Sequence, residues 1–165
     1  RNYAFRDASG NTITNGKTKH LGIELEFATP LVWNFDLAAA ATYARHTYEF
    51  TNVPEKIFPG NEVDTAPRTL ANVRLGYNFD EARARLEWVH MGAYKTSADN
   101  LHDYDGHDLL NLRAEYELTQ NLALFGRLAN ILDTRYADRA DFAFGNDRYF
   151  PGEDRALYAG ATVKF

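Results

Sequence analysis

The chain has 165 residues, 45% of them hydrophobic and 14% aromatic, with a formal net charge of −5 at pH 7. The negative charge and the lack of a basic stripe argue against a nucleic-acid partner. The absence of cysteine excludes thiolate metal sites, thiol catalysis and disulfides. No apolar run approaches the roughly 18 residues of a membrane-spanning helix, so contact with a bilayer would have to be made by strands.

Most of the chain divides into segments of about ten residues in which apolar and polar side chains alternate. The first clear segment, residues 19–28, places Leu21 and Leu25 on one face and Glu24 and Glu26 on the other. This period of two is typical of a β-strand with one apolar side. The same pattern predicts strands at residues 33–50, 68–79, 83–94, 109–118, 122–132 and 157–165, and the end of one more at residues 2–7.

The segment at residues 33–50 allows a second interpretation, because its four consecutive alanines suit a helix. Its position between two turns and its aromatic residues Trp33, Phe35 and Tyr43 favour a strand. We therefore predict an all-β chain, with the strand beginning at Trp33.

The connections between the predicted strands alternate in length. Short links are expected at residues 29–31, 80–82 and 119–121, and long polar loops at residues 51–67, 95–108 and 134–154. In a meander of hairpins every second connection lies at the same end of the sheet. Short turns at one end and extended loops at the other are typical of an antiparallel transmembrane β-barrel.

A soluble antiparallel sandwich would also show alternating strands. Such a fold would place its polar face in bulk water, and its connections need not alternate in length. Here the polar face mixes acids with arginines that could pair across a lumen, which favours the membrane barrel. These residues are Glu24, Glu26, Asp36, Arg74, Arg83, Arg85, Glu87, Arg113, Glu115, Glu117 and Arg127.

The last forty residues resemble the C-terminal end of the TonB-dependent outer-membrane receptors. That family commonly reads Asn-Leu-Phe-Asp-x-x-Tyr, then a loop, then Tyr-x-Pro-Gly-x-x-Arg, then a closing strand that ends in Phe. Upstream residues match two further stretches of the family, although Ile131 and Leu132 replace the commoner Leu-Phe. The matching positions are Gly22, Glu24, Glu26, Ala66, Pro67, Asn72, Tyr77, Asn130, Asp133, Tyr136, Tyr149, Pro151, Gly152, Arg155 and Phe165.

The resemblance implies that residues 1–165 are the C-terminal third of a receptor barrel of about 22 strands, with seven or eight strands present here. The N-terminal plug domain and the earlier strands of the barrel are expected to be absent, and Arg1 to be a cut end or boundary. The resemblance also implies that the last strand carries a signal for the outer-membrane assembly machinery, through Tyr158, Gly160, Val163 and Phe165.

The function implied by the resemblance is import of a bulky, scarce solute, such as an iron chelate or a cobalamin-like compound, across the outer membrane of a Gram-negative bacterium. The expected partners are outer-membrane lipid, an extracellular small molecule and, only through the absent plug, the TonB-type energising complex. We expect the chain by itself to be incompetent for energised uptake. The alternative is a self-contained barrel of about eight strands that serves as an anchor or adhesin.

Several polar clusters could suggest other chemistry. His102 and His107 lie among aspartates, but their spacing matches no standard metal site, and we expect solvated loops there and no resident cofactor or metal. No nucleophile–base set is present, so an enzyme is not expected. Asn130 and Asp133 follow a strand, where Asx side chains often cap the backbone, and we predict a structural role for both.

Overall fold

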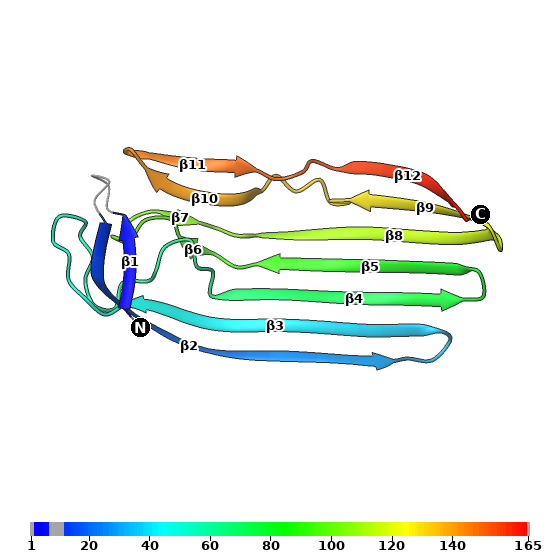
Figure 1. Ribbon diagram of the computed structural model, residues 1–165, viewed down its shortest axis with the longest axis horizontal. Helices are drawn as coiled ribbons and strands as arrows, with labels where there is room; N and C mark the ends of the chain where they lie inside the picture. The colour runs from blue at the N-terminus through cyan, green and yellow to red at the C-terminus, as the bar shows by residue number, and fades with distance from the viewer. Residues whose placement is uncertain (1, 7–11, 165) are drawn as a thin grey trace.

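The computed structural model describes residues 2–6 and 12–164, which form one large antiparallel sheet and two small ones (Figure 1). The predicted all-β antiparallel fold is confirmed, and the alanine-rich segment is a strand. The order of the large sheet is β1-β2-β3-β4-β5-β8-β9-β12. Its strands are β1 (Asn2–Arg6), β2 (Thr12–Pro30), β3 (Phe35–Tyr48), β4 (Thr69–Phe79), β5 (Ala82–Met91), β8 (His107–Thr119), β9 (Leu122–Ala129) and β12 (Ala156–Val163).

The large sheet is open rather than closed into a barrel. Over the described part of the chain, β1 pairs with β2 alone and β12 with β9 alone, so the sheet has two free edges. Unpaired edge groups in hydrocarbon cost several kcal/mol each. The alternative of a self-contained small barrel is therefore wrong for this structure. No helix within residues 2–6 and 12–164 has the length and apolar character needed to cross a membrane.

The strand register puts apolar side chains on one face of the sheet. Leucines stand directly opposite one another across six neighbouring strands, and the outermost, Leu157, is 76% exposed. Such a continuous exposed apolar surface is far larger than a water-soluble monomer normally presents. The row consists of Leu37, Leu75, Leu86, Leu112, Leu128 and Leu157.

The tight turns gather at one end of the sheet, as predicted (Figure 1). The turn predicted at residues 29–31 lies further along, because β2 continues to Pro30. Trp33 and Asn34 have φ angles of 56° and 63° and form the centre of this turn, as in the two-residue turns that suit the twist of a hairpin. The prediction that Trp33 begins the next strand is therefore wrong, and β3 begins at Phe35.

The three long connections at the other end are folded rather than extended. Short strands lie within two of them: β6 (Tyr94–Lys95) pairs with β7 (Asp103–Tyr104), and β10 (Ala137–Ala143) pairs with β11 (Asn146–Pro151). We call residues 51–68, 92–106 and 130–155 together the loop cap. Sequence periodicity missed these strands because they are short and, in β10 and β11, rich in Asp and Arg.

The buried apolar residues of the described chain lie in or next to the loop cap. They are not in the middle of the large sheet, whose two faces are both open. Ile57 in the first loop and Ala140 on β10 are fully buried. The remaining members of this set are Tyr48, Tyr94, Ala129 and Ala137.

Candidate functional site

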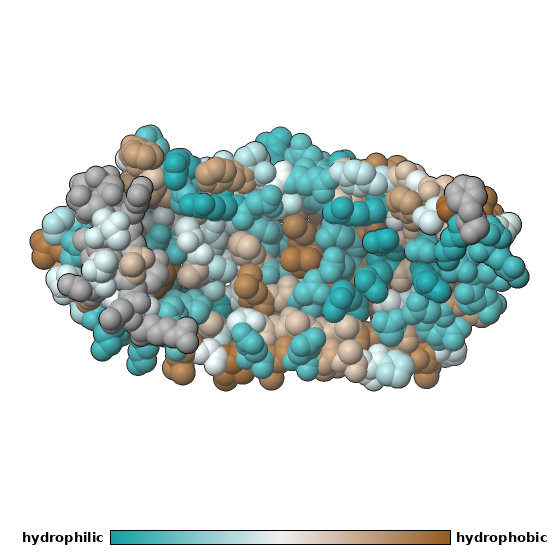
Figure 2. Space-filling view, viewed as in Figure 1, coloured by the Kyte–Doolittle hydropathy of each residue, from teal (hydrophilic) through white to brown (hydrophobic). Residues whose placement is uncertain are grey.

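The second face of the large sheet carries charged and polar side chains. Figure 2 shows hydrophilic residues over the middle of the molecule towards the tight turns, with hydrophobic residues along its lower margin. The register explains this separation, because residues that alternate with the leucine row must point the opposite way. One face of the sheet is therefore suited to lipid and the other to water.

Several charges on the polar face stand opposite, or close to, a charge of the other sign on the next strand. Arg74 stands opposite Glu87, and Glu87 accepts a hydrogen bond of 2.9 Å from the Asn72 amide. Arg83 stands opposite Glu115 and lies 3.5 Å from Glu117. Opposite charges at directly paired positions stabilise a sheet by roughly 0.2–1 kcal/mol per pair.

A row of three arginines breaks this rule. Arg85 on β5 is paired with Arg113 on β8, which is paired in turn with Arg127 on β9. Arg127 lies 3.5 Å from Glu153 and 5.5 Å from the centre of the Tyr158 ring. The guanidinium groups of Arg85 and Arg113 have no hydrogen-bond or ion-pair partner among residues 2–6 and 12–164.

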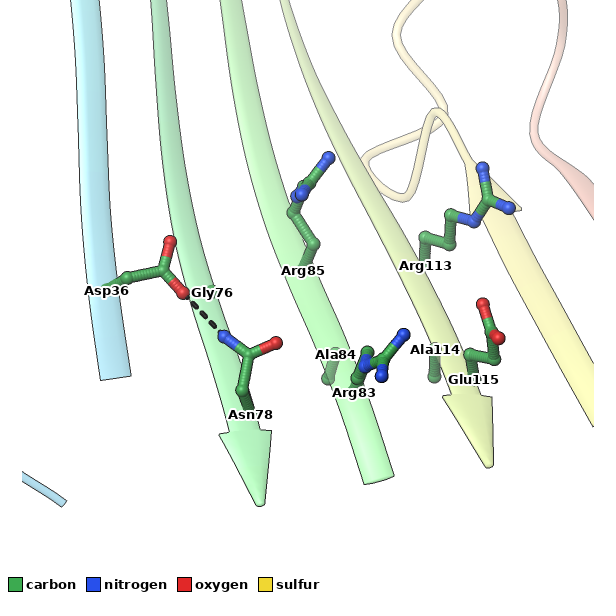
Figure 3. A pocket seen from close by; sticks show the side chains of 9 residues that line it. All are labelled: Asp36, Gly76, Asn78, Arg83, Ala84, Arg85, Arg113, Ala114 and Glu115. Atoms are coloured by element: carbon green, nitrogen blue, oxygen red, sulfur yellow. Dashed lines mark hydrogen bonds between the residues drawn. The ribbon is translucent and has the colours of Figure 1, made fainter. Parts of the chain in front are cut away.

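The unpaired part of this arginine row lines two shallow pockets. In Figure 3 the side chains of Arg85 and Arg113 rise from neighbouring strands, and the hydrogen bond of 2.8 Å from Asn78 to Asp36 lies beside them. Like charges at paired positions destabilise a sheet, and the planar guanidinium binds carboxylate or phosphate through two hydrogen bonds. The row can therefore hold an anionic group inside the polar face, a feature that sequence analysis missed.

The loop cap is tied together through two tyrosines. The Tyr94 hydroxyl accepts a hydrogen bond of 2.8 Å from the Ala140 amide and donates one of 3.1 Å to the Ala140 carbonyl. The Tyr104 hydroxyl contacts both backbone groups of Ala137 in the same way, at 3.0 and 3.3 Å. β6 and β7 therefore hold β10 in place through side chains that satisfy its backbone.

The first loop is joined to the second through Asn100. The Asn100 side chain accepts a hydrogen bond of 2.6 Å from the Glu62 amide and donates one of 2.8 Å to the Glu62 carbonyl. The amide of Thr65 also donates to the carbonyl of Lys95, at 2.8 Å. The loops that were expected to be solvated are partly exposed, but some of their backbone groups are satisfied by one another.

Asn130 is the most highly connected of the predicted motif residues. It is buried, has a φ of 49°, and follows the end of β9. Its side chain accepts a hydrogen bond of 3.0 Å from the Thr134 amide and donates bonds of 2.9 and 3.1 Å to the carbonyls of Thr134 and Glu153. Its own amide donates to the Asn111 side chain at 2.9 Å. Asn130 thus connects two stretches that lie about twenty residues apart.

The other residues of the two motifs surround the same point. Gly152 lies against the Tyr136 ring, and a Cβ at this glycine would be only 2.1 Å from a ring carbon. The Gly152 amide donates to the Tyr136 carbonyl at 3.0 Å, and Arg155 lies 3.4 Å from Asp133. Pro151 ends β11 opposite Ala137. The structure therefore brings the motifs together at the base of the β10–β11 hairpin. The remaining member, Tyr149, is exposed and 6.4 Å from Tyr104, centre to centre.

Three of the four residues predicted to form the C-terminal assembly signal, Tyr158, Gly160 and Val163, lie on β12. Tyr158 points to the polar face, and its hydroxyl donates to Glu153. Gly160 is covered by the Phe125 ring, since a Cβ there would be 2.4 Å from a ring carbon. Val163 lies exposed on the apolar face, whereas Phe165 lies outside the described residues.

The structure does not bring His102 and His107 together with the neighbouring aspartates. His102 is hydrogen-bonded to Asp147 at 3.0 Å and stacks on Phe142, with 3.7 Å between ring centres. His107, the first residue of β8, contacts the Tyr104 hydroxyl at 2.9 Å. Both histidines therefore connect parts of the loop cap.

Asp141 on β10 is buried between two arginines. Burial raises the pKa of its carboxyl, but this is outweighed by Arg148 and Arg139, whose nitrogens lie 2.7 and 2.6 Å away, so the pKa is lowered overall. The stabilisation is therefore complete above the unfolded-state value of about 3.9 and is lost as the pH falls through the lower folded value.

We expect the β10–β11 hairpin to become susceptible to an acid-active protease as the pH falls below about 4. Cleavage sites mapped by mass spectrometry at a series of pH values would measure this. Asp141→Asn should abolish the pH dependence, whereas Asp154→Asn, at an exposed position, should leave it intact. Identical acid profiles for the unmodified protein and Asp141→Asn would contradict the prediction.

Comparison with known proteins agrees with this geometry. The family model described as "TonB dependent receptor-like, beta-barrel" matches residues 1–131. The vitamin B12 transporter BtuB of Photobacterium profundum is 26% identical over 95 residues, which are 58% of this chain and 14% of that protein.

Solved structures of related proteins share the fold of this chain. The ferric yersiniabactin uptake receptor FyuA of Yersinia pestis has a TM-score of 0.81 at 17% identity, over 94% of this chain and 25% of the receptor. The siderophore receptor PiuA of Acinetobacter baumannii also has a TM-score of 0.81, at 16% identity, over 99% of this chain and 24% of the receptor. The chain thus spans about a quarter of the length of these receptors.

The family consists of receptors and transporters, in agreement with the expectation that the chain is not an enzyme. Its members are located in the outer membrane of Gram-negative bacteria. The match covers most of the chain, and the open antiparallel sheet with one apolar and one charged face is a part of such a barrel. The chain belongs to the TonB-dependent receptor β-barrel family.

Proposed function

We propose that this chain forms the C-terminal part of a receptor that imports a bulky, scarce solute across the outer membrane. The observation that carries the proposal is the division of the sheet into a leucine face and a charged face. A leucine face suits lipid and a charged face suits an aqueous lumen. The similar proteins are described as transporters or receptors of vitamin B12, ferric yersiniabactin and siderophores, and we propose a solute of this class.

The solute would first contact the three long loops of the cap. The β10–β11 hairpin is the best candidate within them, because it exposes aromatic rings beside arginines. Phe144 at its tip is 88% exposed, and the Arg148 guanidinium lies 5.7 and 5.9 Å from the ring centres of Phe144 and Phe150. Aromatic rings and arginines together suit a large, partly anionic ligand with aromatic or conjugated groups.

The other proposed partners are inferred from the open edges and the apolar face of the sheet and from the family. The two free edges of the sheet would be paired by further strands of the receptor, and a plug domain in the lumen would contact the TonB-type energising complex. The leucine face would contact outer-membrane lipid. Tyr158, Gly160, Val163 and Phe165 would present β12 to the outer-membrane assembly machinery. Asn130, Asp133, Tyr136, Tyr149, Pro151, Gly152 and Arg155 would shape the base of the hairpin.

Uptake of radiolabelled vitamin B12 and of ferric siderophores would test the proposal. Cells that lack their own receptor for each solute should regain uptake when they produce the whole receptor, and only when TonB is present. Residues 1–165 alone should restore none, because their sheet has unpaired edges. If the whole receptor supports no TonB-dependent uptake of any solute in the panel, the proposal fails.

The contribution of the hairpin can be separated from transport itself. Phe144→Ala should raise the solute concentration needed for half-maximal uptake and leave the maximal rate unchanged, because the residue would act in binding alone. Phe79→Ala, at an exposed phenylalanine at the tight-turn end of β4, is the matched control. Equal uptake curves for the unmodified receptor and Phe144→Ala would exclude the hairpin tip as a contact.

A further inference from the structure

Two histidines stand directly opposite each other where the large sheet meets the loop cap. His20 on β2 is paired with His46 on β3. Their Nδ1 atoms are 2.6 Å apart, and their ring centres are 4.9 Å apart. Both share the face of Glu24, which is paired with Thr42 on the same two strands. The pair therefore lies on the polar face, next to the beginning of the first long loop.

A third side chain orients one of these imidazoles. The Thr18 hydroxyl, which is buried, lies 2.9 Å from Nε2 of His20. When Nε2–H donates to this hydroxyl, the lone pair of His20 is on Nδ1 and faces His46. Histidines that bind metals usually have their second ring nitrogen held by a hydrogen bond of this kind. The arrangement directs a nitrogen lone pair at the partner ring.

We propose that His20 and His46 bind a divalent transition metal, with Cu²⁺ preferred, through their two Nδ1 atoms. Metal–nitrogen bonds of about 2.0–2.1 Å place two ligand nitrogens roughly 2.9 Å apart at a right angle and roughly 3.3 Å apart at a tetrahedral angle. The present 2.6 Å separation needs only a small rotation of the side chains to reach the right-angle value. Imidazole ligands suit copper, and Cu²⁺ binds most tightly among the divalent first-row metals.

The site would keep open coordination positions. No group of three or more His, Asp or Glu side chains in the described ranges 2–6 and 12–164 is arranged to hold a metal. Two imidazoles would therefore bind the ion, and water or the donor atoms of a small chelator would fill the other positions. The proposed copper site requires that both histidines lie on the polar face of the sheet. It does not require that any particular solute is imported.

The test is a titration of the whole, detergent-purified receptor with Cu²⁺, followed by electron paramagnetic resonance. We expect a bound Cu²⁺ whose spectrum shows coupling to two nitrogens. His20→Gln and His46→Gln should each remove one nitrogen coupling, and the double variant should lose the signal. Thr18→Val should keep both couplings but weaken binding by roughly 10-fold or more, as for other outer ligands of metal-bound histidines.

His102→Gln is the matched control, because His102 is a loop histidine with a carboxylate partner, Asp147, instead of a second histidine. It should bind Cu²⁺ like the unmodified receptor. The heat-modifiable migration of each variant on gels would show that its barrel is folded. Absence of bound Cu²⁺, or an unchanged spectrum in the folded double variant, would overturn the proposal while leaving the uptake result unaffected.

Discussion

The receptor carrying Ala39→Arg should be about 2–4 kcal/mol less stable in a bilayer than the unmodified receptor, the usual effect of an arginine at the midplane of an outer-membrane strand. Ala39 lies midway between Phe35 and Tyr43 on β3, and it is paired with Phe27 and Val73 on the apolar face. Its replacement would place a charge among the apolar side chains of the face that we propose contacts lipid. Urea titration of the receptor folded into lipid vesicles would measure the loss.

Ala40→Arg provides a control that differs only in the face of the sheet. Ala40 is the next residue on the same strand, and it is paired with Glu26 and Asn72 on the polar face. An arginine there would stand opposite a carboxylate, so we expect a change within about 0.5 kcal/mol. Equal losses for the two variants would contradict the assignment of lipid and lumen faces.

Asn130→Ala should destabilise the base of the β10–β11 hairpin by about 2–4 kcal/mol. The change would leave the Thr134 amide and the carbonyls of Thr134 and Glu153 without their partner. A fully buried unsatisfied group costs about 1–3 kcal/mol, but Thr134 and Glu153 are only half-buried, so the three groups together cost less than their sum for a buried site. Alanine is also disfavoured at the φ of 49°. Hydrogen exchange across residues 131–155 would report the loss as faster exchange.

Two further variants distinguish the effect of the positive φ at residue 130 from the effect of the side-chain hydrogen bonds of Asn130. Asn130→Gly tolerates the positive φ and should be milder than alanine by about 1 kcal/mol. Asn130→Asp retains an acceptor for the Thr134 amide but sets an oxygen against two carbonyls, and so should not restore stability. Exchange rates unchanged in all three variants would show that these hydrogen bonds do not hold the hairpin.

The strands of the large sheet could be predicted from the sequence because each one has an apolar side and a polar side. Lipid and water select opposite side chains at alternate positions, so the pattern of β4, β5 and β8 is visible in the residues themselves. The alanine-rich β3 was recognised by its aromatic ends and its place between turns. That β1 and β12 are edge strands could not be predicted in this way. A strand becomes an edge when no further strand is present to pair with it, and this leaves no pattern in its own residues.

The loop cap could not be predicted, because its stability comes from contacts between distant polar residues. Tyr94 and Asn100 satisfy backbone groups that lie in other loops, and Asp141 is buried with Arg148 from the neighbouring strand. A polar, glycine-containing loop has the same composition whether it is solvated or packed. The family motifs pointed to Asn130 and Gly152 as structural positions, but they did not show that both lie at the base of the β10–β11 hairpin.

The sequence by itself determined which side chains share a face, because alternation is a property of a single strand. Pairing across a tight turn depends on where that turn lies. A turn centred at residue 30 would have set His20 opposite Ala40, whereas the observed turn at Trp33 and Asn34 sets it opposite His46. Pairing across a long loop, such as that of Arg85 with Arg113, was decided only by the tertiary structure, because a loop of that length fixes no register.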